Sequence, residues 1–166
     1  MTLYHGSCVA VRSPDVVYGR EEFDFGQGFY LTRLRKQAID WARIVAGRGP
    51  RRRAILNKYA FDKKAAIAAG YRFKEFLAYD MEWLAYVVDC RNGGRLQRRY
   101  DIVEGGVAND NVIDTVEDFE NGIITAEQAL GQLRYKKVNH QVCLHNQDVI
   151  DRFLRFQLSE GIPRAR

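Results

Sequence analysis

Two short glycine-flanked segments hold the residues of this chain whose types and spacing could do chemistry. LYHGS covers residues 3–7 and DFGQGFYLT covers residues 24–32. A residue without Cβ, such as Gly6, lets a ligand approach the backbone closely. The face of a tyrosine ring, such as that of Tyr30, attracts a cationic heterocycle. The two segments therefore predict a ligand pocket, provided that the chain brings them together.

The surrounding pattern places both segments on strands. Residues 3–5 and 29–31 are predicted to be short strands next to glycine turns, and Thr32 is expected to cap a following helix. Apolar residues recur at helical intervals in that helix up to the breaker GRGP: Leu34, Ala38, Trp41, Ala42 and Val45. The first half of the chain therefore predicts a strand, a glycine turn, a second strand and a helix.

The rest of the chain mixes strands and helices. Residues 53–61 alternate as a strand does, and residues 73–90 are expected to form one long helix or two short ones. The face predicted for the strand at 53–61 carries Ala54, Leu56, Lys58 and Ala60. The remaining expected elements are a strand at 100–109, a helical hairpin at 110–119 and 125–133 with a Thr125–Gln128 capping box, a strand at 138–144 and a helix at 147–158. Because strands and helices do not alternate regularly, the predicted class is α+β, with a split, mainly antiparallel sheet and flanking helices.

The two glycine-flanked segments resemble the N-terminal signatures of the ADP-ribosyltransferase superfamily. The likeness is to its diphtheria-toxin and poly-ADP-ribose-polymerase branch, whose members carry an HG(S/T) strand and a GxGxY strand. The chain is more similar still to an uncharacterised bacterial family of this superfamily, which shares LYHGS, DFGxGFYLT, a YDIVxGxVAND-like segment and a late glutamine strand. The resemblance covers residues 2–157 and implies an ADP-ribosyltransferase-like fold around a cleft for NAD, which is a substrate.

The resemblance also implies roles for residues of both segments. His5 would bond a ribose hydroxyl of NAD, and Gly6 would present its backbone N–H and C=O to the nicotinamide amide. Ser7 would add a further hydrogen bond. Gly28 belongs to the turn that lets the second strand meet the dinucleotide, and Tyr30 would stack on the nicotinamide ring.

Further contacts to NAD are expected from residues outside these strands. Trp41 stands eleven residues after the first aromatic, where the polymerases carry a second stacking ring; the alternative is a core tryptophan on the apolar helix face. Gln37 and Ala38 replace a lysine and a serine of the polymerases, which argues against polymer formation. Arg12 and Arg20 lie between the two segments, where an arginine could reach the pyrophosphate.

The third element of the superfamily is usually a glutamate on a late strand, and Gln141 in VNHQVCLH aligns with it. Strand alternation puts Gln141, Cys143 and His145 on one face and His140 on the other. A glutamine can hydrogen-bond the ribose, but it cannot take a proton or carry negative charge. Asn139 falls where toxin relatives carry a side chain that recognises the acceptor.

Other polar residues are given lesser roles. Asp24 and Gln27 are expected to be turn residues. Three carboxylates are alternatives to the glutamate that position 141 lacks: Asp101, Glu104 and Asp110. Of these, Asp110 is expected to cap a helix. No metal site is expected, because strand alternation separates the histidine at 140 from the other two candidate ligands, at 143 and 145.

Length and composition set the outer limits. The 166 residues are 46% hydrophobic, which predicts one domain at 1–160 followed by a basic tail at 161–166. With no signal segment, no apolar run long enough for a membrane helix and three widely spaced cysteines, the chain is expected to be cytoplasmic, off the membrane and without disulfides. The formal charge of +5 is concentrated in RGPRRR, RLQRR and the tail, which favours an anionic partner.

These observations and the resemblance together predict a mono-ADP-ribosyltransferase. It would move one ADP-ribose from NAD to a macromolecular acceptor, with nucleic acid slightly favoured over protein. The bacterial setting of the similar family suggests a toxin or defence effector that a small cognate antitoxin restrains. The alternatives are an NAD glycohydrolase, and a catalytically silent module that binds NAD or a protein.

Overall fold

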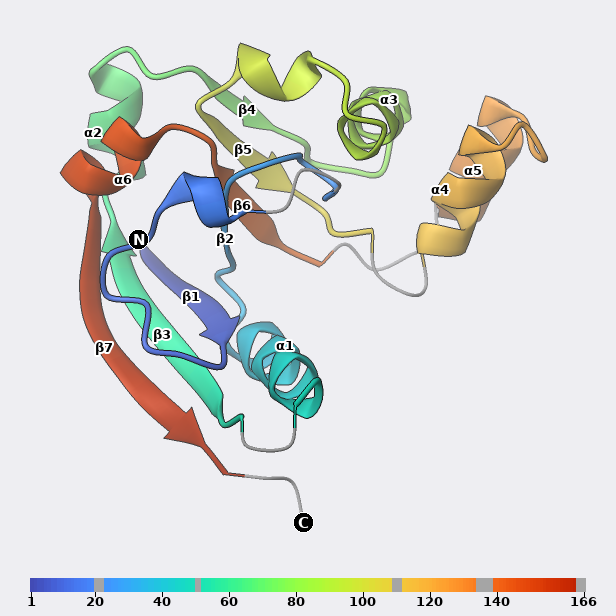
Figure 1. Cartoon of the computed structure of the whole chain (residues 1–166). Coiled ribbons are helices and arrows are strands. Elements are labelled where there is room, and N and C mark those ends of the chain that lie inside the picture. The colour runs from blue at the N-terminus through green and yellow to red at the C-terminus, as the bar shows by residue number, and fades with distance from the viewer. Residues whose placement is uncertain (20–22, 50–51, 109–111, 134–138, 164–166) are drawn as a thin grey trace.

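Two β-sheets form the framework of the protein (Figure 1). The computed structural model describes residues 1–19, 23–49, 52–108, 112–133 and 139–163. Strands β1 (Thr2–Ser7), β3 (Ala54–Phe61) and β7 (Leu154–Ile162) make an antiparallel sheet in the order β1-β3-β7. The second sheet has the order β2-β6-β5-β4 and comprises β2 (Phe29–Leu31), β6 (Gln141–Leu144), β5 (Ile102–Gly105) and β4 (Phe73–Glu75). In it β4 and β5 run parallel, and the other described pairs are antiparallel. The predicted α+β class with a split, mainly antiparallel sheet and flanking helices is confirmed.

Helices flank the two sheets. They are α1 (Arg35–Gly47), α2 (Lys63–Ala68), α3 (Met81–Arg91), α4 (Ile113–Glu120), α5 (Ala126–Leu133) and α6 (Gln147–Phe153), with 3-10 turns η1 (Val16–Tyr18) and η2 (Leu96–Arg99). In Figure 1, α1 lies beside β1, whereas α4 and α5 form a hairpin on the far side of α3. In the described part of the chain, no helix is long and apolar enough to cross a membrane.

The second sheet is covered on both faces. One face packs into a cluster with helices α3, α4 and α5, to which Val103 and Cys143 contribute. The other face joins the first sheet in a second cluster, to which Val142 and Leu144 contribute. Because side chains alternate along a strand, β5 and β6 need apolar residues at successive positions to fill both clusters.

Short polar side chains begin several helices. Asp80 accepts a hydrogen bond from the backbone of Trp83 at the start of α3, and Asn146 does the same for Asp148 at the start of α6. The predicted capping box is confirmed: Thr125 Oγ1 accepts from Gln128 N at 3.2 Å, and the Gln128 side chain accepts from Thr125 N at 2.8 Å.

Two helix predictions are wrong in part. The segment 73–90 begins with a strand, β4, because Phe73–Glu75 pairs with β5 before the Asp80 cap starts α3. The predicted helix at 147–158 ends at Phe153, and β7 follows directly. Its LRFQL stretch alternates with a period of two and pairs with β3, so β7 also takes up the first two residues of the predicted tail.

β3 keeps its alternation and pairs with β1 in unbroken register. Ala54 and Leu56 are buried on the predicted face, and Asn57, Tyr59 and Phe61 are buried on the opposite face. The register with β7 shifts between Lys58 and Tyr59, where β7 has one extra residue.

Candidate functional site

A backbone bridge joins the two sheets beside the predicted site. Tyr4 donates its N–H to Thr32 O at 2.8 Å, and Thr32 donates its N–H to Tyr4 O at 2.9 Å. Beyond this bridge β1 and β2 separate, and the His5 side chain spans the gap: Nδ1 lies 2.8 Å from Tyr30 O. Antiparallel counting from the bridge places Gly6 opposite Tyr30. The structure therefore brings these three predicted site residues together.

The contact with Tyr30 O fixes the tautomer of His5. A carbonyl only accepts, so Nδ1 carries the proton, and in the neutral ring Nε2 is the acceptor. Burial lowers the pKa of His5, against the opposing effect of the Tyr30 carbonyl, so the ring is neutral at pH 7. The imidazole packs on Phe29 at 4.6 Å between ring centroids. His5 thus presents Nε2 as a fixed acceptor for a hydroxyl group.

The backbone of Gly6 has a donor and an acceptor directed towards β2. In an antiparallel strand the N–H and C=O of one residue point to the same side, and the side alternates along the chain. Because the N–H and C=O of Tyr4 both bond Thr32, those of Gly6, two residues later, also point towards β2 and away from β3. Among the described residues, no hydrogen bond satisfies the Gly6 pair. A carboxamide, which has one acceptor oxygen and a donor NH₂, is complementary to this pair.

The need for glycine at position 6 also has a packing reason that the sequence did not reveal. A Cβ at Gly6 would lie 2.1 Å from Ala38 O and 2.8 Å from Ala42 N of α1. Ala38 and Ala42 form the buried face of α1, so three small residues let this helix approach β1 closely. Ala38 therefore belongs to this helix–strand contact.

The ring of Tyr30 is held by the turn that precedes β2. Its OH donates to Gly26 O at 2.6 Å and accepts from Phe25 N at 3.1 Å, and Phe23 packs against the ring edge. Burial raises the pKa of the phenol, so it stays protonated. Gly26 has φ +78°, which favours glycine, and a Cβ at Gly28 would come within 2.5 Å of Cys143 Sγ. Gly26 is thus required for the shape of the turn, and Gly28 lets the turn pack against β6.

Trp41 is an exposed residue of α1. Its side chain is 42% exposed, and Arg48 lies over the ring with its guanidinium carbon 5.5 Å from the centroid. The alternative of a core tryptophan is therefore wrong. Trp41 flanks the Ala38 and Ala42 face that contacts Gly6, but the structure shows no ring contact between Trp41 and Tyr30 among the described residues.

Gln141 lies at the start of β6, on the same face as Tyr30 and Cys143. It is 7% exposed, and its Nε2 donates to Gly106 O at 3.0 Å and to Asp24 Oδ2 at 3.2 Å. The carboxylate of Asp24 is buried, accepts from Ala108 N at 2.7 Å, and lies 3.4 Å from the Arg91 guanidinium. Burial raises the pKa of Asp24, while these donors oppose the shift. Asp24 is therefore more than the turn residue that was predicted.

The other residues predicted to contact NAD or the acceptor lie in different surroundings. Ser7 ends β1 and accepts from Val9 N at 3.2 Å, and Asn139 is half-buried just before β6. Arg12 stacks on Phe156 of β7, with 5.6 Å between its guanidinium carbon and the ring centroid. Arg20 lies outside the described residues, as does the predicted helix cap Asp110.

The carboxylates Asp101 and Glu104 have structural partners. Asp101 binds the backbone and guanidinium of Arg72 and the amide of Asn146. Glu104 is 1% exposed and contacts Arg33, Lys63 and His140. Burial opposes ionisation of both groups, but their partners outweigh it and lower each pKa to about 2.

His140 lies on the opposite side of β6 from Cys143 and His145, as strand alternation predicted. His140 contacts Glu104 and Arg33, whereas His145 Nδ1 lies 2.7 Å from Gln27 O. In the described part of the chain, no three His, Cys, Asp or Glu side chains gather as metal ligands would.

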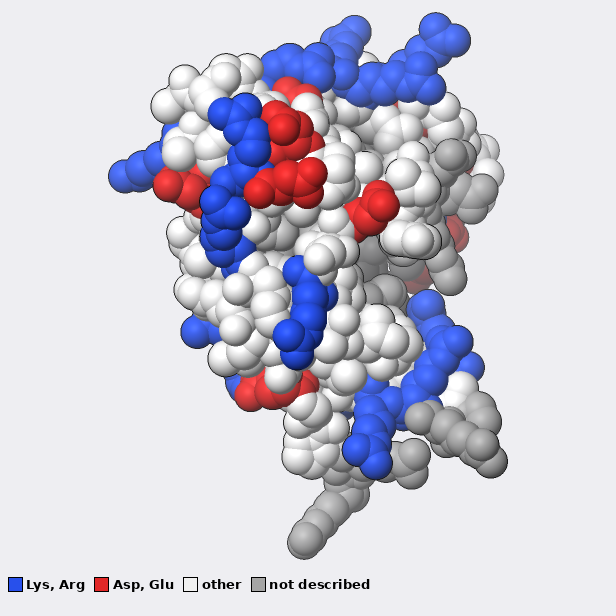
Figure 2. Space-filling view, turned by 60° about the vertical axis from the view of Figure 1, so that its left-hand side comes forward, with Lys and Arg blue, Asp and Glu red and all other residues white. Residues whose placement is uncertain are grey.

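The described basic residues lie in more than one group. Arg48, Arg52 and Arg53 are exposed around the end of α1, and Arg95, Arg98 and Arg99 are exposed at η2. On the face in view, Figure 2 shows Lys and Arg side chains in separate groups with acidic side chains between them. An anionic acceptor would therefore meet two basic groups that lie apart.

Sequence reasoning missed three residues that hold the site. Asp24 fixes Gln141, and Gly106 accepts from the same amide. Asn57 is fully buried and binds Val11 N and Val9 O, which anchors the loop after β1. The signal for Asn57 was an uncharged polar residue in the middle of a mainly apolar strand. For Asp24, no signal distinguished a buried carboxylate from a turn residue.

Comparison with protein families gives one match. The model of a family described as "Protein of unknown function (DUF3990)" matches residues 1–156. The comparisons with curated proteins and with solved structures give no match.

Proposed function

The chain belongs to the DUF3990 family, and we propose that it is a mono-ADP-ribosyltransferase that moves ADP-ribose from NAD to a macromolecule. The observation that carries this proposal is the junction of β1 and β2. There His5 Nδ1 bonds the backbone oxygen of Tyr30, which leaves Nε2 free to accept, and the backbone pair of Gly6 faces Tyr30 across the two strands. These groups match the ribose hydroxyls, the carboxamide and the cationic ring of the nicotinamide riboside half of NAD.

The residues would divide the work of the reaction. Gly6 pairs with the carboxamide, and the aromatic rings of Tyr30 and Trp41 contact the nicotinamide. His5 Nε2 accepts a hydrogen bond from a ribose hydroxyl and thereby holds the sugar in place. The bond between C1′ and the nicotinamide nitrogen breaks, nicotinamide leaves with the electron pair, and an oxocarbenium-like cation develops. A nucleophile of the acceptor then bonds to C1′ and loses its proton.

The contacts to the nicotinamide ring and the ribose lower the activation barrier for cleavage, because they fix the geometry of the bond that breaks. Gln141 supplies a hydrogen bond to the ribose instead of the full charge of a glutamate, so the mechanism depends on orientation and on a nucleophilic acceptor. Such an activity would suit a bacterial toxin or defence effector that an antitoxin restrains.

The test is incubation of the purified protein with NAD labelled in the ADP-ribose part, together with nucleic acid and protein fractions of a cell extract. The proposal expects label in a macromolecule and free nicotinamide in equal amounts. Free ADP-ribose without labelled macromolecule would identify a glycohydrolase. Saturable binding of unchanged NAD would identify a silent module and overturn the transfer reaction.

A further inference from the structure

We propose that Asp24 is a positioning residue for Gln141, whose amide it holds so that Oε1 accepts a ribose hydroxyl of NAD. The inference rests on the proposed function, and it concerns a residue outside both predicted strands. It also accounts for the presence of a glutamine in place of the expected glutamate.

The hydrogen bonds determine which way the Gln141 amide points. Nε2 lies 3.0 Å from Gly106 O and 3.2 Å from Asp24 Oδ2. A backbone carbonyl only accepts, so the NH₂ group must face it. The two N–H groups are then used on Gly106 and Asp24. Among the described residues, Oε1 forms no hydrogen bond, and it is the remaining polar atom of this side chain.

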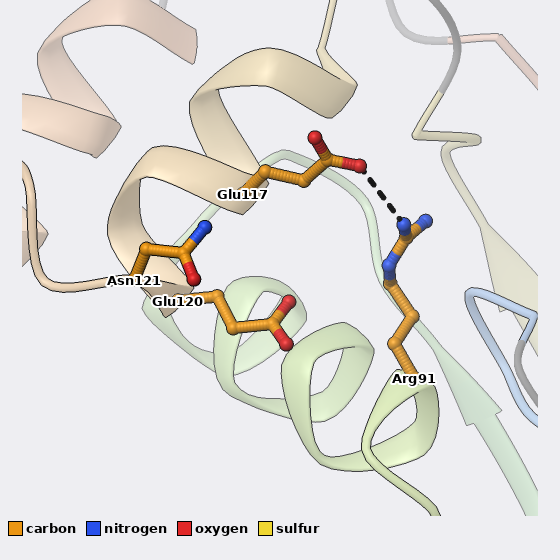
Figure 3. Close-up of a pocket in the computed structure, with 4 residues that line it drawn as sticks. All are labelled: Arg91, Glu117, Glu120 and Asn121. Carbon is orange, nitrogen blue, oxygen red and sulfur yellow. Dashed lines mark hydrogen bonds and ion pairs between the residues drawn. The ribbon is translucent and has the colours of Figure 1, made fainter.

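Asp24 is itself fixed from several sides. Its Oδ2 also accepts from Ala108 N at 2.7 Å, and its Oδ1 lies 3.4 Å from the Arg91 guanidinium. Figure 3 shows Arg91 reaching from the end of α3 towards Glu117 of α4, at a shallow pocket that Glu120 and Asn121 also line. Arg91 thus connects the buried carboxylate to α4.

One turn serves both Gln141 and the aromatic ring. Asp24 binds the amide of Gln141, and two residues later Gly26 O accepts from the OH of Tyr30. Phe25 N donates to the same OH. The segment 24–26 therefore sets the positions of the ring and the amide relative to each other.

A glutamate at position 141 would not fit this arrangement. Its carboxylate would face the carboxylate of Asp24 and the carbonyl of Gly106, with no donor for either contact. Two buried carboxylates in contact repel, so one of them must take a proton. The NH₂ group of a glutamine can donate to both acceptors, Asp24 Oδ2 and Gly106 O. The negative charge that a glutamate would carry is instead on the neighbouring Asp24 side chain.

The test is a double-mutant cycle on nicotinamide release from NAD, with Asp24→Ala, Gln141→Ala and the double variant. Asp24→Ala is expected to lower kcat/KM about 10- to 100-fold, the usual cost of losing a hydrogen bond to a charged group. In the Gln141→Ala background the same change should alter kcat/KM less than about threefold, because Asp24 acts through Gln141. Equal losses in both backgrounds, or no loss in the single variant, would overturn the proposal.

Asp24→Asn is the matched control. It keeps an oxygen that can accept from Gln141 and Ala108, although its NH₂ group replaces the oxygen that faces Arg91, so activity is expected within about fivefold of the unmodified protein. Thermal unfolding of each variant shows whether the fold is kept. If Asp24→Ala does not fold, the activities of Asp24→Asn and Gln141→Glu test the proposal instead. The proposal expects the former to stay active and the latter to lose at least about tenfold, and the reverse order would overturn it.

Nuclear magnetic resonance separates this inference from the proposed function. The side-chain NH₂ of Gln141 should exchange slowly with solvent in the unmodified protein and faster in Asp24→Ala, whether or not NAD is turned over. Absence of NAD binding would refute the proposed function and, with it, the role of Oε1. A fast-exchanging NH₂ in the unmodified protein would refute the part that Asp24 plays.

Discussion

His5 Nδ1 lies 2.8 Å from the backbone oxygen of Tyr30, although 25 residues separate them in the chain. This hydrogen bond ties an imidazole of β1 to the backbone of β2 where the two strands have parted. It fixes the orientation of the histidine and leaves Nε2 as the acceptor.

NAD turnover should be independent of pH above about 6.5 and should fall at lower pH. Burial lowers the pKa of His5 below 6.5, so protonation, which converts Nε2 from acceptor to donor, occurs only in the acid range. The folded protein then binds fewer protons than the unfolded chain, so its stability also decreases as pH falls below 6.5. The measurement is the pH profile of kcat/KM beside His5→Asn. An acid limb that persists unchanged in His5→Asn would contradict the assignment.

Tyr30→Ala should weaken NAD binding about 5- to 150-fold, because the loss of a stacking ring costs about 1–3 kcal/mol. Tyr30→Phe keeps the ring but loses the hydrogen bonds to Gly26 O and Phe25 N. It should bind NAD nearly as well and lose about 1 kcal/mol of unfolding free energy. Calorimetric titration and urea unfolding measure the two effects. Equal affinities in the Ala and Phe variants would mean that the ring does not contact NAD.

Gly6→Ala should destabilise the fold by about 3 kcal/mol, because the added methyl group would meet backbone atoms of Ala38 and Ala42 that cannot easily move. Gly131→Ala is the control, since a Cβ there meets no atom within 4 Å. Urea unfolding of both variants measures the difference. Equal stability of the two would show that α1 lies farther from β1 than the structure places it.

NAD should quench the fluorescence of Trp41. This ring is 42% exposed beside the Gly6 contact, whereas the other tryptophan, Trp83, is fully buried. Trp41→Phe should abolish most of the quenching and keep most of the affinity, because an aromatic face remains. Quenching that survives in Trp41→Phe would show that Trp41 lies outside the site.

Acid should unfold the protein partly through Glu104. Arg33, Lys63 and His140 outweigh burial and lower its pKa from 4.5 to about 2. A depressed carboxyl pKa stabilises the fold above 4.5, and this contribution is lost as pH falls from 4.5 towards 2. The loss is on the order of 3 kcal/mol. Glu104→Gln should be strongly destabilised at pH 7 and should show a weaker pH dependence between 4.5 and 2. Parallel stability curves for the two proteins would contradict this.

The elements around the site could be read from the sequence because their signals are local. Glycine turns, short apolar strands and a helix with apolar residues at helical intervals identify β1, β2 and α1. The strands β4 and β7 were missed because their pairing partners are distant in the chain. Phe73–Glu75 becomes a strand only beside β5, and Leu154–Ile162 only beside β3.

The site was predicted in part for the same reason. The histidine, glycine and tyrosine stand in recognisable motifs, whereas the burial of Asp24 depends on Gln141 and Ala108, which are 117 and 84 residues away. The burial of Asn57 likewise depends on Val9 and Val11, which are 48 and 46 residues away. Tertiary contacts of this kind are visible only in three dimensions.

The most direct measurement is nicotinamide release from NAD by the unmodified protein and by His5→Ala, in the presence of a cell extract. The account predicts release with equimolar transfer of ADP-ribose to a macromolecule, and a loss of at least about tenfold in the variant. Saturable NAD binding should accompany it. A folded, unmodified protein that neither binds NAD nor releases nicotinamide would contradict the account at its centre.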